Sequence, residues 1–194
     1  GLRARLASPV DIVDIDARPR SVLLRTDGGD RIASRHVVFC TGYEIPFGQA
    51  PRGHRAISTW ALATAPQKRR IWPEACFIWE ASEPYLYLRT TEDDRVICGG
   101  EDEDFVDEDT RDRLIAAKTR TLGRKLADLL PGLDTEAEFA WAGTFGTSTT
   151  GLPTIGEMPG LRNCWAVMGF GGNGITYSRI GSEIVRAALT GKGD

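Results

Sequence analysis

The stretch that decides the fold is Cys164–Gly191, which reads CWAVMGFGGNGITYSRIGSEIVRAALTG. It begins with the apolar, strand-like run Cys164–Met168 and continues with a loop that contains four glycines. Apolar residues then recur at helical spacing, and Gly191 is suited to end a helix. We therefore predict a strand, a glycine loop and a helix. Glycines let the N–H groups of such a loop approach a ligand closely, and a helix N-terminus carries partial positive charge. The helix is expected to bury one apolar face, made of Ile175, Ile180, Ile184, Val185, Ala188 and Leu189.

The glycine spacing at Gly169, Gly171 and Gly174 matches G-x-G-x-x-G, the fingerprint of dinucleotide-binding βαβ units. That unit needs a second parallel strand after the helix and an acidic residue about 20 positions further on. Only twenty residues follow Gly174, which leaves no room for a helix, a loop and a strand. The spacing therefore does not predict an NAD dehydrogenase, and a ligand of this loop needs its main contacts elsewhere.

The composition excludes several classes of function. The chain has 194 residues, of which 41% are hydrophobic and 26% charged, as in an ordinary globular domain. A net charge of −3 gives no electrostatic reason to bind nucleic acid or an anionic membrane. No apolar run approaches the about 18 residues of a membrane span. We expect a cytoplasmic protein that binds neither nucleic acid nor membrane.

The cysteines and histidines do not have the spacing of a metal site. There is no C-x-x-C pair, and the two histidines, His36 and His54, are far apart in the sequence. We expect no metal, and we expect the cysteines to be buried free thiols in a reducing compartment. They are Cys40, Cys76, Cys98 and Cys164.

The start of the chain is unusual. It begins with Gly1, and its first methionine is Met158. We therefore expect a piece of a longer protein, or a chain whose first residue remains from a tag.

Residues 1–45 are predicted to form a strand meander. Two strand patterns, Val10–Ile15 and Ser21–Thr26, precede a glycine-rich hairpin turn. Val37–Cys40 is a continuous apolar run, typical of a strand buried on both faces. Gly42 follows it, and a glycine at the end of a strand lets another group come close. An ordinary buried strand followed by a turn is an equally good interpretation.

Residues 46–140 are predicted to form an antiparallel sheet, entered through an irregular link within Tyr43–Ile71. Aromatic and aliphatic residues then alternate along one strand, so that Tyr85, Tyr87 and Arg89 share a face and two leucines share the other. The polar face could line a ligand site or simply be solvated.

A long helix is predicted at Thr110–Leu130. The segment Glu101–Asp112 before and within its first turn holds eight carboxylates but lacks the spacing of a calcium loop. We expect these acids to complement the positive end of the helix dipole instead. Pro131-Gly132 ends the helix.

Several motifs recur in a familiar order. They are Val37–Gly42, Tyr85–Arg89 with Gly99-Gly100, Trp141–Gly143, Gly151–Gly156 and Gly169–Ile175. Together they cover nearly the whole chain, which resembles the C-terminal half of FAD-dependent oxidoreductases of the D-amino-acid oxidase, glycine oxidase and sarcosine oxidase family.

The resemblance implies an α+β fold. In that family an antiparallel-sheet substrate domain with packed helices is inserted into a discontinuous FAD-binding α/β domain. Residues 1–45 would then be a remnant of the FAD-binding domain, residues 46–140 the substrate-binding domain, and residues 141–194 the C-terminal part of the FAD-binding domain. The ADP-binding βαβ unit that opens such proteins has no counterpart in this sequence.

The resemblance also implies a set of site residues. The cofactor-binding residues would be Thr41, Gly42, Gly143, Pro153, Gly156, Gly169, Gly171, Gly172, Asn173, Gly174 and Ile175. The substrate would lie against Tyr85, Tyr87 and Arg89, while catalytic residues stay unknown. This sequence departs from many relatives at Thr150, where they carry Asp, and it lacks an arginine near Trp141–Phe145 that some amino-acid oxidases use to hold a carboxylate.

The implied activity is hydride transfer from a C–N bond of an amine or amino acid to the flavin of FAD. A missing N-terminal FAD-binding segment would supply most cofactor contacts. The 194-residue chain alone would then be inactive, hold FAD weakly or not at all, and tend to self-associate. The alternative is a flavin-free binding or assembly domain that keeps the sheet. For the glycine loop, the alternative is a turn that needs glycines only for its own geometry.

Overall fold

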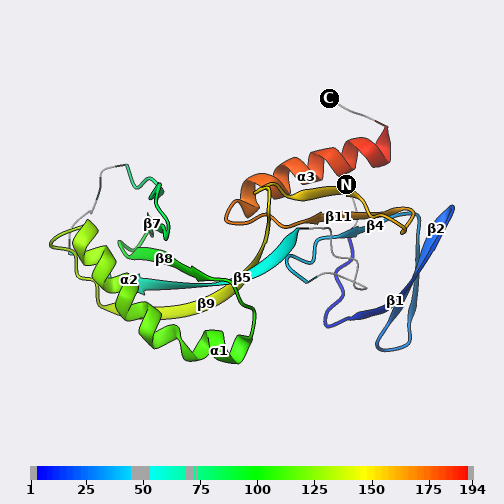
Figure 1. Cartoon of the computed structure of the whole chain (residues 1–194). Helices are drawn as coiled ribbons and strands as arrows, with labels where there is room; N and C mark the ends of the chain where they lie inside the picture. Colours follow the sequence, from blue (N-terminus) through cyan, green and yellow to red (C-terminus); the bar gives the residue numbers. More distant parts are fainter. Residues whose placement is uncertain (1–3, 45–52, 69–71, 73, 192–194) are drawn as a thin grey trace. The chain divides into compact units, whose positions relative to one another are not determined.

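The computed structural model describes residues 4–44, 53–68, 72 and 74–191 (Figure 1). The chain divides into two compact units. Unit 1 comprises residues 1–55 and 146–194, and unit 2 comprises residues 56–145. Two strands, β5 (His54–Thr64) and β9 (Ala137–Ser148), run through both units. The boundary predicted between residues 45 and 46, in the middle of the irregular link, falls outside the described residues.

Unit 1 begins with a three-stranded antiparallel meander. Its strands are β1 (Ile12–Arg18), β2 (Ser21–Thr26) and β3 (Arg31–Ser34), in the order β1-β2-β3. The predicted hairpin turn joins β2 and β3, and Gly29 takes the left-handed conformation there, with a φ of 86°. Val22 and other apolar residues of β2 are buried, so the meander has its own packed face.

A second sheet of unit 1 joins distant parts of the sequence. Its order is β10 (Thr154–Glu157), β11 (Cys164–Met168) and β4 (Val37–Phe39). Strand β11 is antiparallel to β10 and parallel to β4, with Cys164 opposite Val37. The apolar runs Val37–Cys40 and Cys164–Met168, which lie in the two segments that the resemblance assigns to one domain, are therefore paired.

Helix α3 (Gly174–Thr190) packs on this sheet (Figure 1). It ends at Gly191, whose left-handed φ of 67° confirms the predicted cap. The predicted apolar face is only partly the buried one. Val185 is buried as predicted, together with Gly181. A Cβ at Gly181 would come within 2.6 Å of Val167, so its absence lets the helix approach the sheet. The three isoleucines assigned to the buried face, Ile175, Ile180 and Ile184, are exposed.

Unit 2 is built on a five-stranded sheet in the order β6-β7-β8-β5-β9. Strands β6 (Ile78–Trp79), β7 (Leu86–Thr90), β8 (Val96–Glu103) and β5 are antiparallel to their neighbours in this series. One face of the sheet is apolar and lies against α2, as Figure 1 shows. The core on this face consists of Trp60, Leu62, Leu86, Leu88, Val96, Cys98, Leu122 and Leu126.

The predicted long helix is two helices, α1 (Glu108–Arg113) and α2 (Ile115–Leu129). Asp107 caps α1 by accepting a hydrogen bond from the Thr110 N–H at 2.8 Å, so the acidic segment does serve the helix N-terminus. The break has a visible cause. The indole of Trp60 donates to the Arg111 carbonyl at 3.0 Å, and the Leu114 N–H donates to the same carbonyl. The carbonyl is thus drawn out of the helical ladder.

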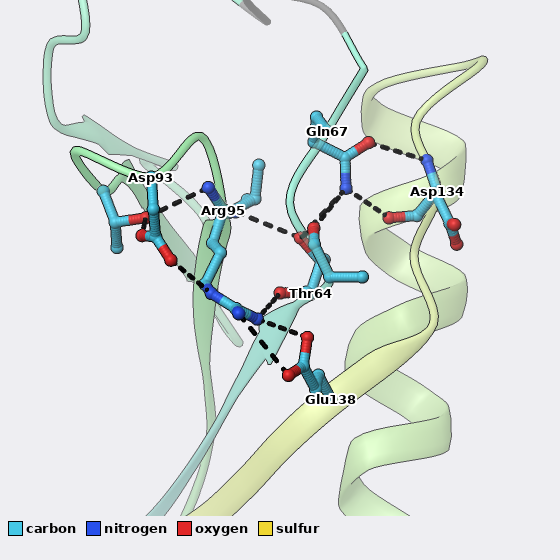
Figure 2. Close-up of polar contacts among 9 residues, drawn as sticks. Thr64, Gln67, Asp93, Arg95, Asp134 and Glu138 are labelled. Carbon is cyan, nitrogen blue, oxygen red and sulfur yellow. Dashed lines mark hydrogen bonds and ion pairs between the residues drawn. The ribbon is translucent and has the colours of Figure 1, made fainter.

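A polar network around Arg95 lies at the end of the unit 2 sheet where β8 begins (Figure 2). The Arg95 guanidinium donates to Asp93 at 2.7 Å, to Glu138 at 2.6 Å and to the Thr64 carbonyl at 3.0 Å. These contacts raise the pKa of Arg95, while hydrogen bonds from Thr91 and Arg95 lower the pKa of Asp93. The network joins the turn that precedes β8 to residues of β5 and β9, and so it fixes the end of the sheet around a single cation.

The cysteines are free, but two of the four are not buried as predicted. Cys40 lies just beyond the last paired residue of β4, and Cys76 lies before β6 begins, so both are exposed. Cys98 and Cys164 lie within strands and are buried, and burial raises the pKa of Cys98 to about 12. No helix in the described part of the chain is long and apolar enough to cross a membrane.

The core of unit 2 gives a first prediction. Leu88 is 0% exposed in the cluster beneath α2, whereas Leu129 at the end of α2 is 40% exposed. Leu88→Ala is expected to lower the free energy of unfolding by about 2–5 kcal/mol, because it leaves a cavity. Leu129→Ala, the same change at a surface position, should cost about 0.5 kcal/mol or less. Equal losses in denaturant titrations of the two variants would contradict this placement of the core.

Candidate functional site

Several predicted site residues of unit 1 meet at one end of the sheet β10-β11-β4. Strands β4 and β11 are parallel, so Thr41-Gly42 and the loop 169–173 leave the sheet at the same end. Strand β10 is antiparallel to β11 with Thr154 opposite Met168, which places Pro153 at this end as well. We call this group the sheet-end site. Carboxyl ends of parallel strands are where ligands of α/β sheets commonly bind.

Two glycines of the loop are needed by the turn itself. Gly169 and Gly171 have left-handed φ values of 74° and 56°. The Gly171 N–H donates to the carbonyl of Gly146 in β9 at 2.8 Å, which ties the loop to a neighbouring strand. At these two positions the interpretation of the loop as an ordinary strand-to-helix turn accounts for the glycines.

Gly172 differs from them. Its φ is not left-handed, and a Cβ built on it would meet nothing within 4 Å. Gly172 and Asn173 are exposed, and Asn173 makes no side-chain capping bond to α3. The first N–H groups of α3 therefore have neither an intrahelical partner nor a side-chain cap. The chain leaves an open backbone surface at a helix N-terminus, which fits the electron-rich edge of a planar ring.

His54, which the sequence did not single out as a site residue, also belongs to the sheet-end site. Its Nε2 lies 2.7 Å from the Thr154 hydroxyl. Its ring occupies the space beside Gly169, where a Cβ would come within 2.3 Å of His54 Cε1. Burial lowers the pKa of His54. Nothing in the local sequence marks it, because Thr154 and Gly169 reach it only through the fold.

The structure separates the remaining predicted residues. Gly156 is paired with Ala166 inside the sheet, and a Cβ there would meet no atom within 4 Å. Ile175 follows the loop and is 91% exposed. Gly143 belongs to unit 2, where the atom nearest to an added Cβ is Thr59 Cγ2 at 4.0 Å. The predicted cofactor residues are thus divided between the two units.

The predicted substrate residues lie on the sheet of unit 2. Leu86 and Leu88 of β7 point into the core, so Tyr85, Tyr87 and Arg89 occupy the opposite face, as the alternation predicted. The Tyr85 hydroxyl donates to Asp102 Oδ2 at 2.7 Å.

Two glycines of β8 leave the space that these tyrosines occupy. A Cβ at Gly99 would lie 2.2 Å from the Tyr87 hydroxyl oxygen, so the ring can cross the strand only because Gly99 has no side chain. Gly100 has a φ of 143°, and a Cβ there would lie 2.3 Å from the Tyr85 carbonyl oxygen. The Gly99-Gly100 pair is therefore a requirement of the aromatic face.

Further aromatic rings extend this face. Trp79 packs against Tyr85 with ring centroids 5.4 Å apart, and Phe77 stacks on Tyr87 at 6.1 Å. Trp79 and Phe77 keep more than half of their surface exposed within unit 2. In the described part of the chain, no group of three or more His, Cys, Asp or Glu side chains is arranged to hold a metal ion.

Comparison with known proteins places the chain in a family. The family model described as DAO, FAD dependent oxidoreductase, matches residues 1–188. The chain belongs to the DAO family. A search of curated proteins gave no match.

Solved structures share the fold at low sequence identity. Glycine oxidase from Geobacillus kaustophilus has a TM-score of 0.75 and 19% identity, over 95% of this chain and 49% of that one. L-proline dehydrogenase from P. horikoshii has a TM-score of 0.74 and 18% identity, over 95% and 50% of the two chains. Iminodiacetate oxidase from Chelativorans sp. BNC1 has a TM-score of 0.75 and 15% identity, over 92% and 48%. This DAO-family chain thus spans about half the length of each.

The contrast between the loop glycines gives a second prediction. Gly169→Ala forces a left-handed φ on alanine and pushes its Cβ into the His54 ring, so it should lower the free energy of unfolding by about 1–3 kcal/mol. Gly172→Ala, the matched change three residues later, should alter it by about 0.5 kcal/mol or less. A Gly172→Ala loss as large as that of Gly169→Ala would show that the turn needs both glycines.

The half-buried His54 gives a third prediction, on pH. The folded pKa of His54 lies below its ordinary value of 6.5, so the unfolded chain binds more protons just below that value. The stability due to neutral His54 is complete above pH 6.5. It is lost as the pH falls from 6.5 through the lower pKa of His54 in the folded chain. The fall in unfolding free energy between about pH 7.5 and about pH 5.5 should be smaller in His54→Gln than in the wild type. An equal fall in His54→Gln and in the wild type would contradict this placement of His54.

Proposed function

We propose that the intact protein containing this chain is an FAD-dependent oxidoreductase that oxidises a C–N bond of an amine or amino acid by hydride transfer to the flavin. Membership of the DAO family supports the cofactor. The similarity to glycine oxidase, L-proline dehydrogenase and iminodiacetate oxidase folds supports the substrate class.

The observation that carries the proposal is the open backbone at Gly172. The turn does not need glycine at this position, yet the position is glycine and adjoins the uncapped N-terminus of α3. When bound, FAD supplies the hydride acceptor. The N–H groups of Gly172, Gly174 and Ile175 would hold the electron-rich edge of its ring, acting as fixed dipoles that need no reorganisation during reaction, while the Asn173 N–H is used within the loop, where it donates to the Phe170 carbonyl. Thr41, Gly42 and Pro153 would complete the ring contacts.

The two units would divide the work. Unit 1 would belong to the FAD-binding domain, and the sheet of unit 2, with Tyr85, Tyr87 and Arg89, would bind the substrate. The sequence has no G-x-G-x-x-G motif followed by an acidic residue at the ribose-binding spacing and a further strand, so the ADP part of FAD would bind outside these 194 residues. We therefore expect the 194-residue chain alone to hold FAD weakly.

A valine at Gly172 tests the proposal in the intact protein. Gly172→Val should leave the thermal stability of the flavin-free protein unchanged, because its side chain meets open space in the fold. It should weaken flavin binding about tenfold or more, because branched carbons would hold the ring away from the backbone donors. Flavin absorbance of the purified protein and the midpoint of its thermal unfolding measure the two effects.

Gly28→Val is the matched control. Gly28 lies in the β2–β3 turn, its φ is not left-handed, and an added Cβ would make only an ordinary contact with Thr26 at 3.8 Å. This variant should retain its flavin. If Gly172→Val retains it equally well, the loop is only a turn. If the wild-type intact protein carries no flavin, the flavin-free binding domain becomes the better account.

A further inference from the structure

The hydroxyl of Tyr85 already donates its only hydrogen bond. Its hydroxyl donates to Asp102 Oδ2 at 2.7 Å, and a phenol has a single O–H to give. Burial and the hydrogen bond to Asp102 raise the pKa of Tyr85, so the phenol keeps that proton throughout the neutral range. The lone pairs that remain on the Tyr85 oxygen can only accept a hydrogen bond.

Asp102, the hydrogen-bond partner of Tyr85, places a carboxylate next to the phenol. Asp102 Oδ1 is buried and has no hydrogen-bond partner among the described residues. The salt bridges among the described residues include none of Asp102, and Lys118 and Lys125 pair with its neighbour Glu101 instead. A buried carboxylate without a cationic partner favours a positive charge close by.

The surrounding rings favour the same kind of ligand. Trp79 lies 5.4 Å and Tyr87 lies 6.5 Å from Tyr85, measured between ring centroids. Aromatic faces attract cations and offer apolar surface to the rest of a ligand. Trp79 is 52% exposed, so this surface is accessible within unit 2.

We propose that Tyr85, held by Asp102, accepts a hydrogen bond from the N–H of a cationic amine whose apolar part lies on Trp79. Asp102 is a positioning residue, because it acts by fixing the direction of the Tyr85 hydroxyl. That the bound amine is the substrate rests on the proposed function.

Paired ligands of opposite charge test the inference. Benzylamine, protonated at neutral pH, and benzoate share a ring and differ in the charged group. Calorimetric titration of the full 194-residue chain should show benzylamine binding about tenfold or more tightly than benzoate. Equal affinities would overturn the proposal.

Two variants separate the hydroxyl from the ring. Tyr85→Phe should weaken benzylamine binding about tenfold, because the acceptor is lost and the ring remains. Tyr87→Phe removes the neighbouring hydroxyl and keeps the ring stacked on Phe77, and its affinity should stay within about twofold of the wild type. Equal losses in both variants would contradict a specific role of Tyr85.

Substitution of Asp102 tests whether its hydrogen bond to Tyr85 acts on the ligand. A bond with a purely structural role would leave the preference for benzylamine over benzoate unchanged. Asp102→Ala removes the acceptor of the Tyr85 O–H. The hydroxyl can then donate its hydrogen bond to a carboxylate, and the preference for benzylamine over benzoate should disappear. Asp102→Asn keeps an acceptor for Tyr85 and removes the charge. It should stay folded in thermal unfolding and show an intermediate preference. An unchanged preference in both folded variants, or in Asp102→Asn alone if Asp102→Ala does not fold, would overturn the role of Asp102.

These outcomes are independent of the flavin. A protein that selects benzylamine through Tyr85 but carries no FAD when intact would contradict the proposed function and leave this inference standing. An intact flavoprotein that does not distinguish benzylamine from benzoate would do the reverse.

Discussion

The structure of unit 1 depends on the parallel pairing of β4 with β11. Parallel strands cannot be joined by a tight turn, so this pair necessarily unites segments that are far apart in the chain. Because both strands run in the same direction, the segments that follow them, Thr41-Gly42 and the loop 169–173, reach the same end of the sheet. The antiparallel β10 then adds Pro153 and Thr154. A single pairing thereby assembles the sheet-end site.

Glycines in this chain have three different tasks. Gly169 and Gly171 allow left-handed turns, and Gly181 lets a helix lie close to a strand. Gly99 makes room for an aromatic side chain. Gly172 meets none of these needs, because an added Cβ would meet no atom within 4 Å. Our proposal that a ligand uses this open backbone therefore depends more on Gly172 than on its neighbours.

Features set by local backbone conformation could be predicted from the sequence. Features set by contacts between residues that are distant in the sequence could not. The Gly191 cap and the two faces of β7 follow from backbone conformation and a period of two, and both were predicted correctly. The single helix at Thr110–Leu130 was wrong because the indole of Trp60 takes the Arg111 carbonyl. The buried face of α3 was predicted correctly at Val185 but not at its three isoleucines, because Gly181, which has no apolar side chain, sets the closest approach. His54 was missed because its partners are distant in sequence.

Backbone amide shifts would test the central claim most directly. Lumiflavin, the flavin ring without ribose or ADP, can be titrated into the isotopically labelled 194-residue chain and followed by two-dimensional NMR, which detects weak binding. We predict that the largest shifts occur at the amides of residues 172–175, with smaller ones at Thr41-Gly42. Shifts confined to other parts of the chain, or none at millimolar ligand, would contradict the assignment of the open backbone at Gly172 to the flavin ring.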